Sequence, residues 1–357
     1  MTPAHGEPSD LSFPNAVGLN QTEPKICAVC KREANCYNFG VMSCDACKMF
    51  FKRTMTLNVR YVCRRNHRCF DENFSCFDPP YCRACRLIRC INVGMRLHLS
   101  TILEVKNRKD DAIVSLIENL LHLDARREKQ LLKCFTHDNP TLEDIIECRK
   151  LSIVARDPTF EMTSSDWCFF GTFTAVQFLL QLGFMRKMDT RDKAILLANY
   201  SAKATLLFSA IRTMRAKKDN LIKPDGKDFF GEFLSKWSDF SVIFTNRVRS
   251  MLVCRLIELK ITNEELVLIA VIFFCNPVLD ELSQDAVRIL TEQQKTYSSA
   301  LMQYCLLTYQ QNGPARFTEL LSLCTVINQY FDDVQYLYWI FQYHFHVQYK
   351  NLVARVI

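Results

Sequence analysis

Eight cysteines near the start of the chain are spaced in a pattern typical of metal binding. They form two sets of four, Cys27, Cys30, Cys44 and Cys47 in the first and Cys63, Cys69, Cys82 and Cys85 in the second. Two cysteines separated by two residues can turn both sulfurs toward one ion, and four thiolates complete the tetrahedral coordination of zinc. Because such a site keeps no open position for water or substrate, the pattern predicts two structural zinc ions and no catalytic metal.

Three further cysteines in this region, Cys36, Cys76 and Cys90, lie outside that spacing. None belongs to a pair separated by two residues, so we interpret each as a spare thiol, although each has the chemistry to replace a neighbouring ligand. The chain holds 18 cysteines, and its first 24 residues lack the apolar segment of a secretion signal. The sequence therefore indicates a protein of a reducing compartment, rather than a secreted protein whose cysteines form disulfide bonds.

Positive charge is concentrated in the same part of the chain. Residues 25–109 hold 17 Lys and Arg against 6 Asp and Glu, a net charge of +11, whereas residues 110–357 hold 28 against 29. A compact basic block is expected to bind a polyanion such as duplex DNA, because each neutralised phosphate releases counterions. A solvated basic surface without a partner would carry the same charge, so charge alone leaves both interpretations open.

The segments that must position these groups are mostly helical. Residues 1–24, which are rich in proline, indicate a flexible tail, and residues 99–112 indicate a hinge that leads into a helix. Beyond the hinge, apolar residues recur at intervals of three and four, without convincing strand alternation, in segments 113–132, 167–185, 190–213, 228–259, 263–274, 283–310 and 314–346. The sequence predicts a small zinc module at 25–98 and an all-α domain at 113–357.

Neither domain contains a motif typical of an enzyme. The sequence has no nucleotide-binding loop, no zinc-hydrolase helix and no nucleophile elbow, so we expect a protein without catalytic activity. The longest strongly apolar run, residues 266–275, is too short to cross a bilayer. No membrane association is expected.

The zinc pattern and two stretches beside it resemble the DNA-binding domain of nuclear receptors. The stretches are SCDACKMFFKR at residues 43–53 and CRACRLIRCINVGM at residues 82–95. The resemblance implies a transcription factor of the nucleus whose recognition helix begins near Cys44 and is anchored by Phe50 and Phe51. A zinc scaffold that recruits protein, such as a ubiquitin-ligase adaptor, also has paired cysteines. The basic excess and the Phe-Phe-Lys-Arg sequence argue against that alternative.

The resemblance also implies which side chains read the DNA. In the family, four positions of the recognition helix govern the reading of bases in the major groove, and here they hold Asp45, Ala46, Lys48 and Met49. Lys48 and Arg53 have the chemistry to donate to guanine, and Asp45 can accept from cytosine. The side chains expected to contact phosphates are those of Lys52, Arg64, Arg65 and Arg68.

Two departures from the familiar receptors change what this helix reads. Asp45-Ala46 stands where those receptors carry Glu-Gly, and Met49 stands where they carry a further Gly. The gap before Cys82 is also longer than usual. With these departures the chain is most similar to the large nematode branch of the family. The base sequence of the DNA half-site is therefore not specified by the resemblance.

The C-terminal half resembles the ligand-binding domain of the same family, a three-layer helical sandwich. The resemblance is carried by residues 116–128, 142–146, 178–197 and 259–277. It implies coregulators, a second receptor in a homodimer or heterodimer, and a small apolar ligand as partners. Bulky side chains of the third helix either line a ligand cavity or simply fill the core, and they are Trp167, Phe169, Phe170, Phe173, Val176 and Gln177. A ligand-regulated receptor and a ligand-independent repressor or dimer partner both remain open.

The coactivator clamp of the family is altered in this chain. Nuclear receptors usually hold a Leu-x-x-Leu-Leu helix between a Lys of the third helix and a Glu of the last helix, each charge satisfying one helix terminus. The matching positions here are Leu180 and Arg355. Because the Lys is replaced by an uncharged residue and the Glu by a residue of opposite charge, we expect the domain not to recruit coactivators by the usual clamp. The domain then represses transcription, relies on a partner receptor for activation, or binds coregulators through another surface.

Overall fold

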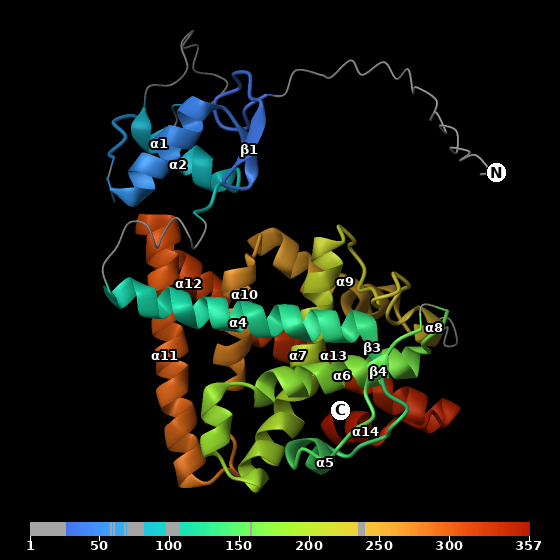
Figure 1. Ribbon diagram of the computed structural model, residues 1–357. Helices are drawn as coiled ribbons and strands as arrows, with labels where there is room; N and C mark the ends of the chain where they lie inside the picture. The colour runs from blue at the N-terminus through green and yellow to red at the C-terminus, as the bar shows by residue number, and fades with distance from the viewer. Residues whose placement is uncertain are drawn as a thin grey trace, which may run out of the picture. The chain divides into compact units, whose positions relative to one another are not determined.

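The computed structural model describes residues 26–57, 59, 61–67, 69, 82–97, 108–157, 159–234 and 240–357. The chain divides into two compact units, one extending to Arg96 and the other starting at Leu97 (Figure 1). The predicted tail at 1–24 and most of the predicted hinge lie outside the described residues.

The first unit combines a short hairpin with two helices. Strand β1 (Cys36–Asn38) pairs antiparallel with β2 (Val41–Ser43). The two residues between them, Phe39 and Gly40, both have positive φ, of 53° and 89°, as a two-residue turn of type I′ requires. Helices α1 (Asp45–Thr56) and α2 (Arg83–Asn92) pack against each other and complete the unit.

The two phenylalanines of α1 have different environments. Phe51 is fully buried, with its ring centroid 5.3 Å from that of Phe39. Phe50 is half-buried, stacked 5.9 Å from the ring of Tyr61 and 4.6 Å from the guanidinium of Arg86. The expectation that both rings anchor α1 in the core therefore holds for Phe51, whereas Phe50 forms a layer between α1 and α2. The difference arises because successive helix residues point about 100° apart.

The second unit is helical, as predicted. Its α-helices are α4 (Arg108–Lys133), α5 (Leu142–Ile146), α6 (Ser164–Leu180), α7 (Thr190–Arg215), α8 (Gly231–Leu234), α9 (Val242–Leu259), α10 (Asn263–Phe274), α11 (Gln284–Tyr309), α12 (Gly313–Leu321), α13 (Leu323–Phe345) and α14 (Asn351–Val356). Two short 3₁₀ helices, η1 (Gly183–Lys187) and η2 (Gln310–Asn312), connect α6 to α7 and α11 to α12.

One detail was not predicted, a strand pair inside the helical unit. Strand β3 (Cys134–Phe135) pairs antiparallel with β4 (Val154–Ala155). Two residues are too few for an alternating pattern to appear in the sequence. The loop between these strands carries α5. Three predicted segments were too long, because 228–259 and 314–346 are each divided into two helices and 167–185 runs past the end of α6 into η1.

Helix α7 lies at the centre of the second unit. It packs against α6, α9, α13 and α14, while α10 packs against α4, α7 and α11 (Figure 1). Among the described residues, α7 is the one helix long and apolar enough to cross a membrane, but 72% of its most apolar window is buried in the unit. That burial identifies α7 as a core helix of the domain.

Candidate zinc centres and DNA-recognition surface

The first predicted ligand set is brought together in space. The sulfurs of Cys27, Cys30, Cys44 and Cys47 all lie within 4.8 Å of one another, and those of Cys30 and Cys44 are 3.5 Å apart. Zn–S bonds of about 2.3 Å place the sulfurs of a tetrahedron roughly 3.8 Å apart, so four thiolates at this spacing fit one zinc ion. A disulfide would need a separation of about 2.0 Å, and these cysteines are free.

The second set has the same arrangement. The sulfurs of Cys63, Cys69, Cys82 and Cys85 lie within 4.8 Å of one another, with 3.6 Å between Cys63 and Cys69 and 3.5 Å between Cys63 and Cys85. In each set one cysteine is the N-cap residue of a helix and a second lies in its first turn. Burial raises the pKa of Cys47 and of Cys85, so the charge of a bound divalent cation is needed to hold these two as thiolates.

Backbone hydrogen bonds favour ionisation of two of these thiols. Burial opposes the Cys27 thiolate, yet N–H groups from the surrounding chain lower its pKa to about 7. The backbone N–H of Arg65 donates to the Cys63 sulfur at 3.3 Å and is the main cause of a pKa lowered to about 6. Both cysteines are therefore prepared to act as anionic ligands, since the thiolate is the metal-binding form.

Two of the three spare cysteines lie in the described part of the chain, and both are separate from the two clusters. Cys36 is exposed in β1, and Cys90 is fully buried in α2, where desolvation raises its pKa to about 12. A buried thiol with such a pKa remains protonated and packs as a small apolar side chain. Cys76 lies outside the described residues.

Arg86 has a role that sequence reasoning missed. Its Nη2 donates to the Cys47 sulfur at 3.2 Å, and its guanidinium lies over the Phe50 ring. Arg86 thereby joins α2 to a ligand of the first cluster and balances thiolate charge there. No feature of the local sequence signals this contact, because Arg86 is one of several arginines in a basic stretch and its partner is 39 residues away.

Helix α1 presents a single solvent-facing side beside the zinc clusters. It buries Cys47, Phe51, Thr54 and Met55. The predicted DNA contacts lie on the rest of its surface, with Asp45, Ala46, Met49 and Arg53 exposed and Lys48 and Lys52 half-buried. Since a helix repeats every 3.6 residues, burial of one stripe leaves these side chains together on the other.

The predicted phosphate contacts outside α1 are in the loop of the second cluster. Arg64 and Arg65 are exposed there, between Cys63 and Cys69. Arg68 lies outside the described residues. The zinc-binding loop therefore keeps two cationic side chains in solvent.

The aromatic residues of α6 pack mainly against each other. Phe173 stacks with Phe169 and Phe170, at centroid distances of 6.1 and 5.7 Å, and all three are fully buried. Trp167 and Val176 are buried as well, whereas Gln177 is half-buried and faces a surface groove. These buried residues of α6 therefore contribute to the core of the domain.

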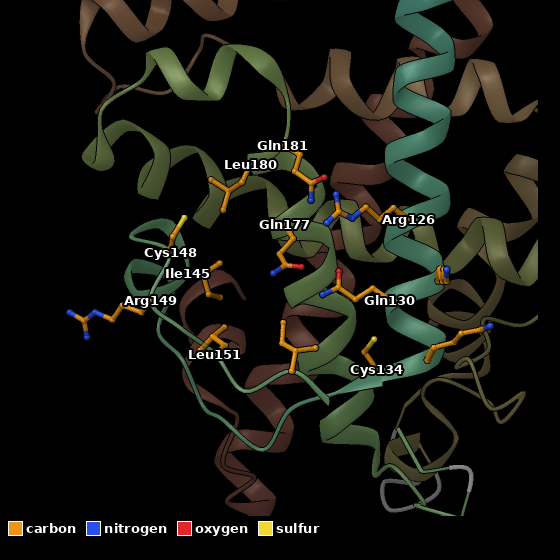
Figure 2. A pocket seen from close by; sticks show the side chains of 13 residues that line it. Arg126, Gln130, Cys134, Ile145, Cys148, Arg149, Leu151, Gln177, Leu180 and Gln181 are labelled. Carbon is orange, nitrogen blue, oxygen red and sulfur yellow. The ribbon is translucent and has the colours of Figure 1, made fainter. Parts of the chain in front are cut away.

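The two clamp positions lie near α5. Leu180 is half-buried and lines an open groove of about 750 Å³ together with Ile145 of α5 and Gln177 (Figure 2). Arg355 of α14 is about half exposed, and its Nε lies 3.9 Å from Oε1 of Glu143 in α5. Each clamp position therefore has a residue of α5 beside it.

Comparisons with known proteins agree with this architecture. A family described as the double treble clef zinc finger of C4 type matches residues 25–97, and one described as the ligand-binding domain of nuclear hormone receptor matches residues 160–341. Both matches are to domains of nuclear receptors.

Similar proteins span almost the whole chain. Nuclear hormone receptor family member nhr-167 of Caenorhabditis elegans is 36% identical over 332 residues, covering 92% of this chain and 95% of that protein. Family member nhr-51 of the same organism is 32% identical, covering 89% and 85%. The Ultraspiracle ligand binding domain from Drosophila melanogaster superposes with a TM-score of 0.48 at 14% identity, covering 63% of this chain and 90% of that structure. The chain therefore belongs to the nuclear hormone receptor family, as a DNA-binding transcription factor with two zinc ions and a helical ligand-binding domain.

Proposed function

We propose that the exposed side of α1 reads bases in the major groove of DNA, with Asp45, Ala46, Lys48 and Met49 choosing the sequence. The observation that carries this proposal is the separation of α1 into a buried stripe and a solvent-facing stripe, in a part of the chain, residues 25–109, whose formal net charge of +11 becomes +7 when eight thiolates hold two zinc ions. A recognition helix held by a folded core is the usual way to present such side chains. We infer that the protein acts in the nucleus, where its target DNA is.

Exchanging the four reading residues together is expected to change the preferred DNA site. Each good base contact that is lost should cost about 1–3 kcal/mol against the original sequence. Selection of binding sites from a random DNA library measures the preference. An unchanged selected sequence would show that α1 is not the reading helix.

Lys52→Ala is the matched control, because Lys52 is proposed to contact a phosphate. It should weaken binding to all sequences similarly and reduce the slope of log affinity against log salt by about 1. A change of sequence preference in this variant would contradict the division between reading and positioning residues.

A second proposal concerns dimerisation through α13. Tyr336, Trp339 and Tyr343 are 53%, 60% and 77% exposed and lie on one face of this helix. Exposed aromatic clusters of this kind are typical of protein interfaces, where aromatic side chains provide much of the binding energy. We propose that this face binds a second copy of the chain, with a heterodimer as the alternative outcome.

Trp339→Glu should therefore weaken self-association. We expect a loss of at least about 2 kcal/mol, or roughly thirtyfold in Kd, in sedimentation velocity. Val278→Glu is the control, since Val278 is 77% exposed but lies outside α13. A wild-type protein that is monomeric at every concentration would rule out the homodimer and leave the heterodimer.

The regulatory domain is proposed to accept a small apolar ligand only through movement of its side chains. Phe169, Phe170 and Phe173 of α6 stack on one another, and a small chamber lined by Cys168 and Tyr338 in the described part of the domain has a volume of about 20 Å³. Such a chamber holds one water molecule. Native mass spectrometry of the purified protein tests the proposal, and a co-purifying small molecule would identify the ligand.

A further inference from the structure

Helix α5 has the side-chain spacing of a helix that docks in a groove. Leu142, Ile145 and Ile146 are separated by three and four residues, so they share one face, and their side chains are 0%, 6% and 9% exposed. This Leu-x-x-Ile-Ile order has the spacing of the Leu-x-x-Leu-Leu helices that nuclear receptors bind from partners. Here the segment belongs to the receptor itself.

The surface beneath α5 is formed by two other helices. α5 packs against α7 and α14, and α14 also packs against α6 and α7. Ile145 and the clamp position Leu180 line the same open groove, which separates α5 from the end of α6 (Figure 2). The apolar face of α5 thus covers a surface made by α7 and α14 beside that groove.

Both ends of α5 are satisfied within its own segment. At the start, Thr141 and Asp144 form a capping box, with hydrogen bonds of 3.1 and 2.9 Å. At the end, the N–H of Arg149 donates to the carbonyl of Asp144 at 3.0 Å and Cys148 has a φ of 56°, which is a Schellman-type cap. A helix capped in this way needs neither charge of a clamp.

The reversed charge at Arg355 matches an acid on α5. Arg355 lies beside Glu143, in the first turn of α5, where a carboxylate is also favoured by the helix dipole. Two hydrogen bonds tie the same segments together, since the backbone N–H and the side-chain amide of Asn351 donate to Asn139 at 2.8 and 3.0 Å. α5 and the last helix therefore hold each other in place.

We propose that α5 is a built-in competitor, which closes the surface of α7 and α14 to partner helices of the same spacing until it leaves. A helix of five residues is not stable by itself, and the chain that follows it, residues 147–155, is mostly exposed, so α5 has room to detach. The inference rests on the proposed regulatory function for its consequence in transcription. The contact itself does not depend on DNA.

The test uses full-length protein and a labelled peptide with the sequence of residues 138–150. Wild-type protein should bind this peptide at least tenfold more weakly than a Leu142→Ser, Ile145→Ser variant, whose own α5 no longer competes. Glu143→Arg is a second variant designed to release α5. It leaves the apolar side chains of α5 unchanged but places a cation beside Arg355 at a half-exposed position. This variant should bind the peptide about fivefold more tightly than wild type. The double variant Glu143→Arg, Arg355→Glu should return to the wild-type peptide affinity, because the two charges again attract each other.

Glu147→Arg is the matched control, since Glu147 is 50% exposed on the same segment and pairs with Arg149. It should leave peptide affinity at the wild-type value. The proposal would be overturned if wild type, the Leu142→Ser, Ile145→Ser variant and the Glu143→Arg variant all bound the peptide equally. It would also be overturned if variants with the wild-type melting temperature did not bind the peptide at all. DNA affinity is measured on the same samples, so a failure at α5 is separated from a failure of the DNA-reading proposal.

Discussion

Cys44→Ser is expected to reduce the zinc content of the protein from two ions per chain to one or fewer, and to abolish specific DNA binding. Cys44 is both a ligand of the first cluster and the N-cap residue of α1, so its loss removes the metal at the point where the recognition helix begins. A structural zinc ion contributes about 10–16 kcal/mol of apparent binding free energy, more than the total stability of a small domain. Metal analysis and DNA-binding anisotropy measure the two effects.

Cys36→Ser provides the comparison for this prediction. Cys36 is exposed and belongs to neither cluster, so the variant should keep both zinc ions and its affinity for DNA. Retention of two zinc ions by the Cys44 variant, or loss of one from the Cys36 variant, would show that the ligand set is assigned incorrectly. Chelation of the wild-type protein should reproduce the loss of DNA binding.

Arg316→Met is expected to destabilise the helical domain by about 3–5 kcal/mol. Arg316 donates from Nε and Nη2 to the carboxylate of Glu265 at 2.8 and 2.7 Å, and from Nη1 to the carbonyl of Leu259 at 2.8 Å. Glu265 is fully buried and also accepts from the hydroxyl of Tyr309 at 2.7 Å. Removing Arg316 leaves a buried carboxylate without its counterion. Urea unfolding followed by tryptophan fluorescence isolates this domain, because the three tryptophans of the chain, Trp167, Trp237 and Trp339, all come after the zinc module in the sequence.

The pH dependence of this effect follows from Glu265. Burial acts to raise its pKa, but hydrogen bonds and charge from Arg316 outweigh burial and lower it. The pair therefore stabilises the native state above the ordinary glutamate range, and this contribution is lost as pH falls through the lowered pKa. In Arg316→Met the effect of burial on Glu265 is opposed only by the hydrogen bonds from Thr262 and Tyr309, so the variant is penalised at neutral pH and less so once Glu265 can be protonated. The difference between wild type and variant should therefore shrink as pH falls, first through the pKa of Glu265 in the variant and then through its lowered pKa in the wild type.

Two controls distinguish the buried pair from a general effect of substitution. Glu265→Gln combined with Arg316→Met should cost less than Arg316→Met alone, because no buried charge remains. Glu319→Gln removes a half-exposed partner of Arg316 at 3.6 Å and should cost less than about 1 kcal/mol. Equal destabilisation by Arg316→Met and Glu319→Gln would contradict the role given to the pair.

The sequence by itself determined which eight cysteines form the two clusters, the helical character of the second domain and the family. Metal ligation depends on local spacing, and the eight ligands predicted from it are the eight that meet in space. Helices repeat every 3.6 residues, so the apolar period was visible along the chain and predicted most of the long helices. The breaks within 228–259 and 314–346 and the pair β3 and β4 were missed, because short interruptions and two-residue strands leave no period to detect.

Only the tertiary structure decided the contacts between distant residues. Glu265 and Arg316 are 51 residues apart, and Arg86 reaches Cys47 across 39, so neither pair has a signature in the local sequence. The sequence identified Arg355 as a reversed charge but gave no reason for it, since its neighbour Glu143 lies more than 200 residues earlier in the chain. Local spacing records what a segment does alone, whereas burial and pairing depend on which segments the fold brings together.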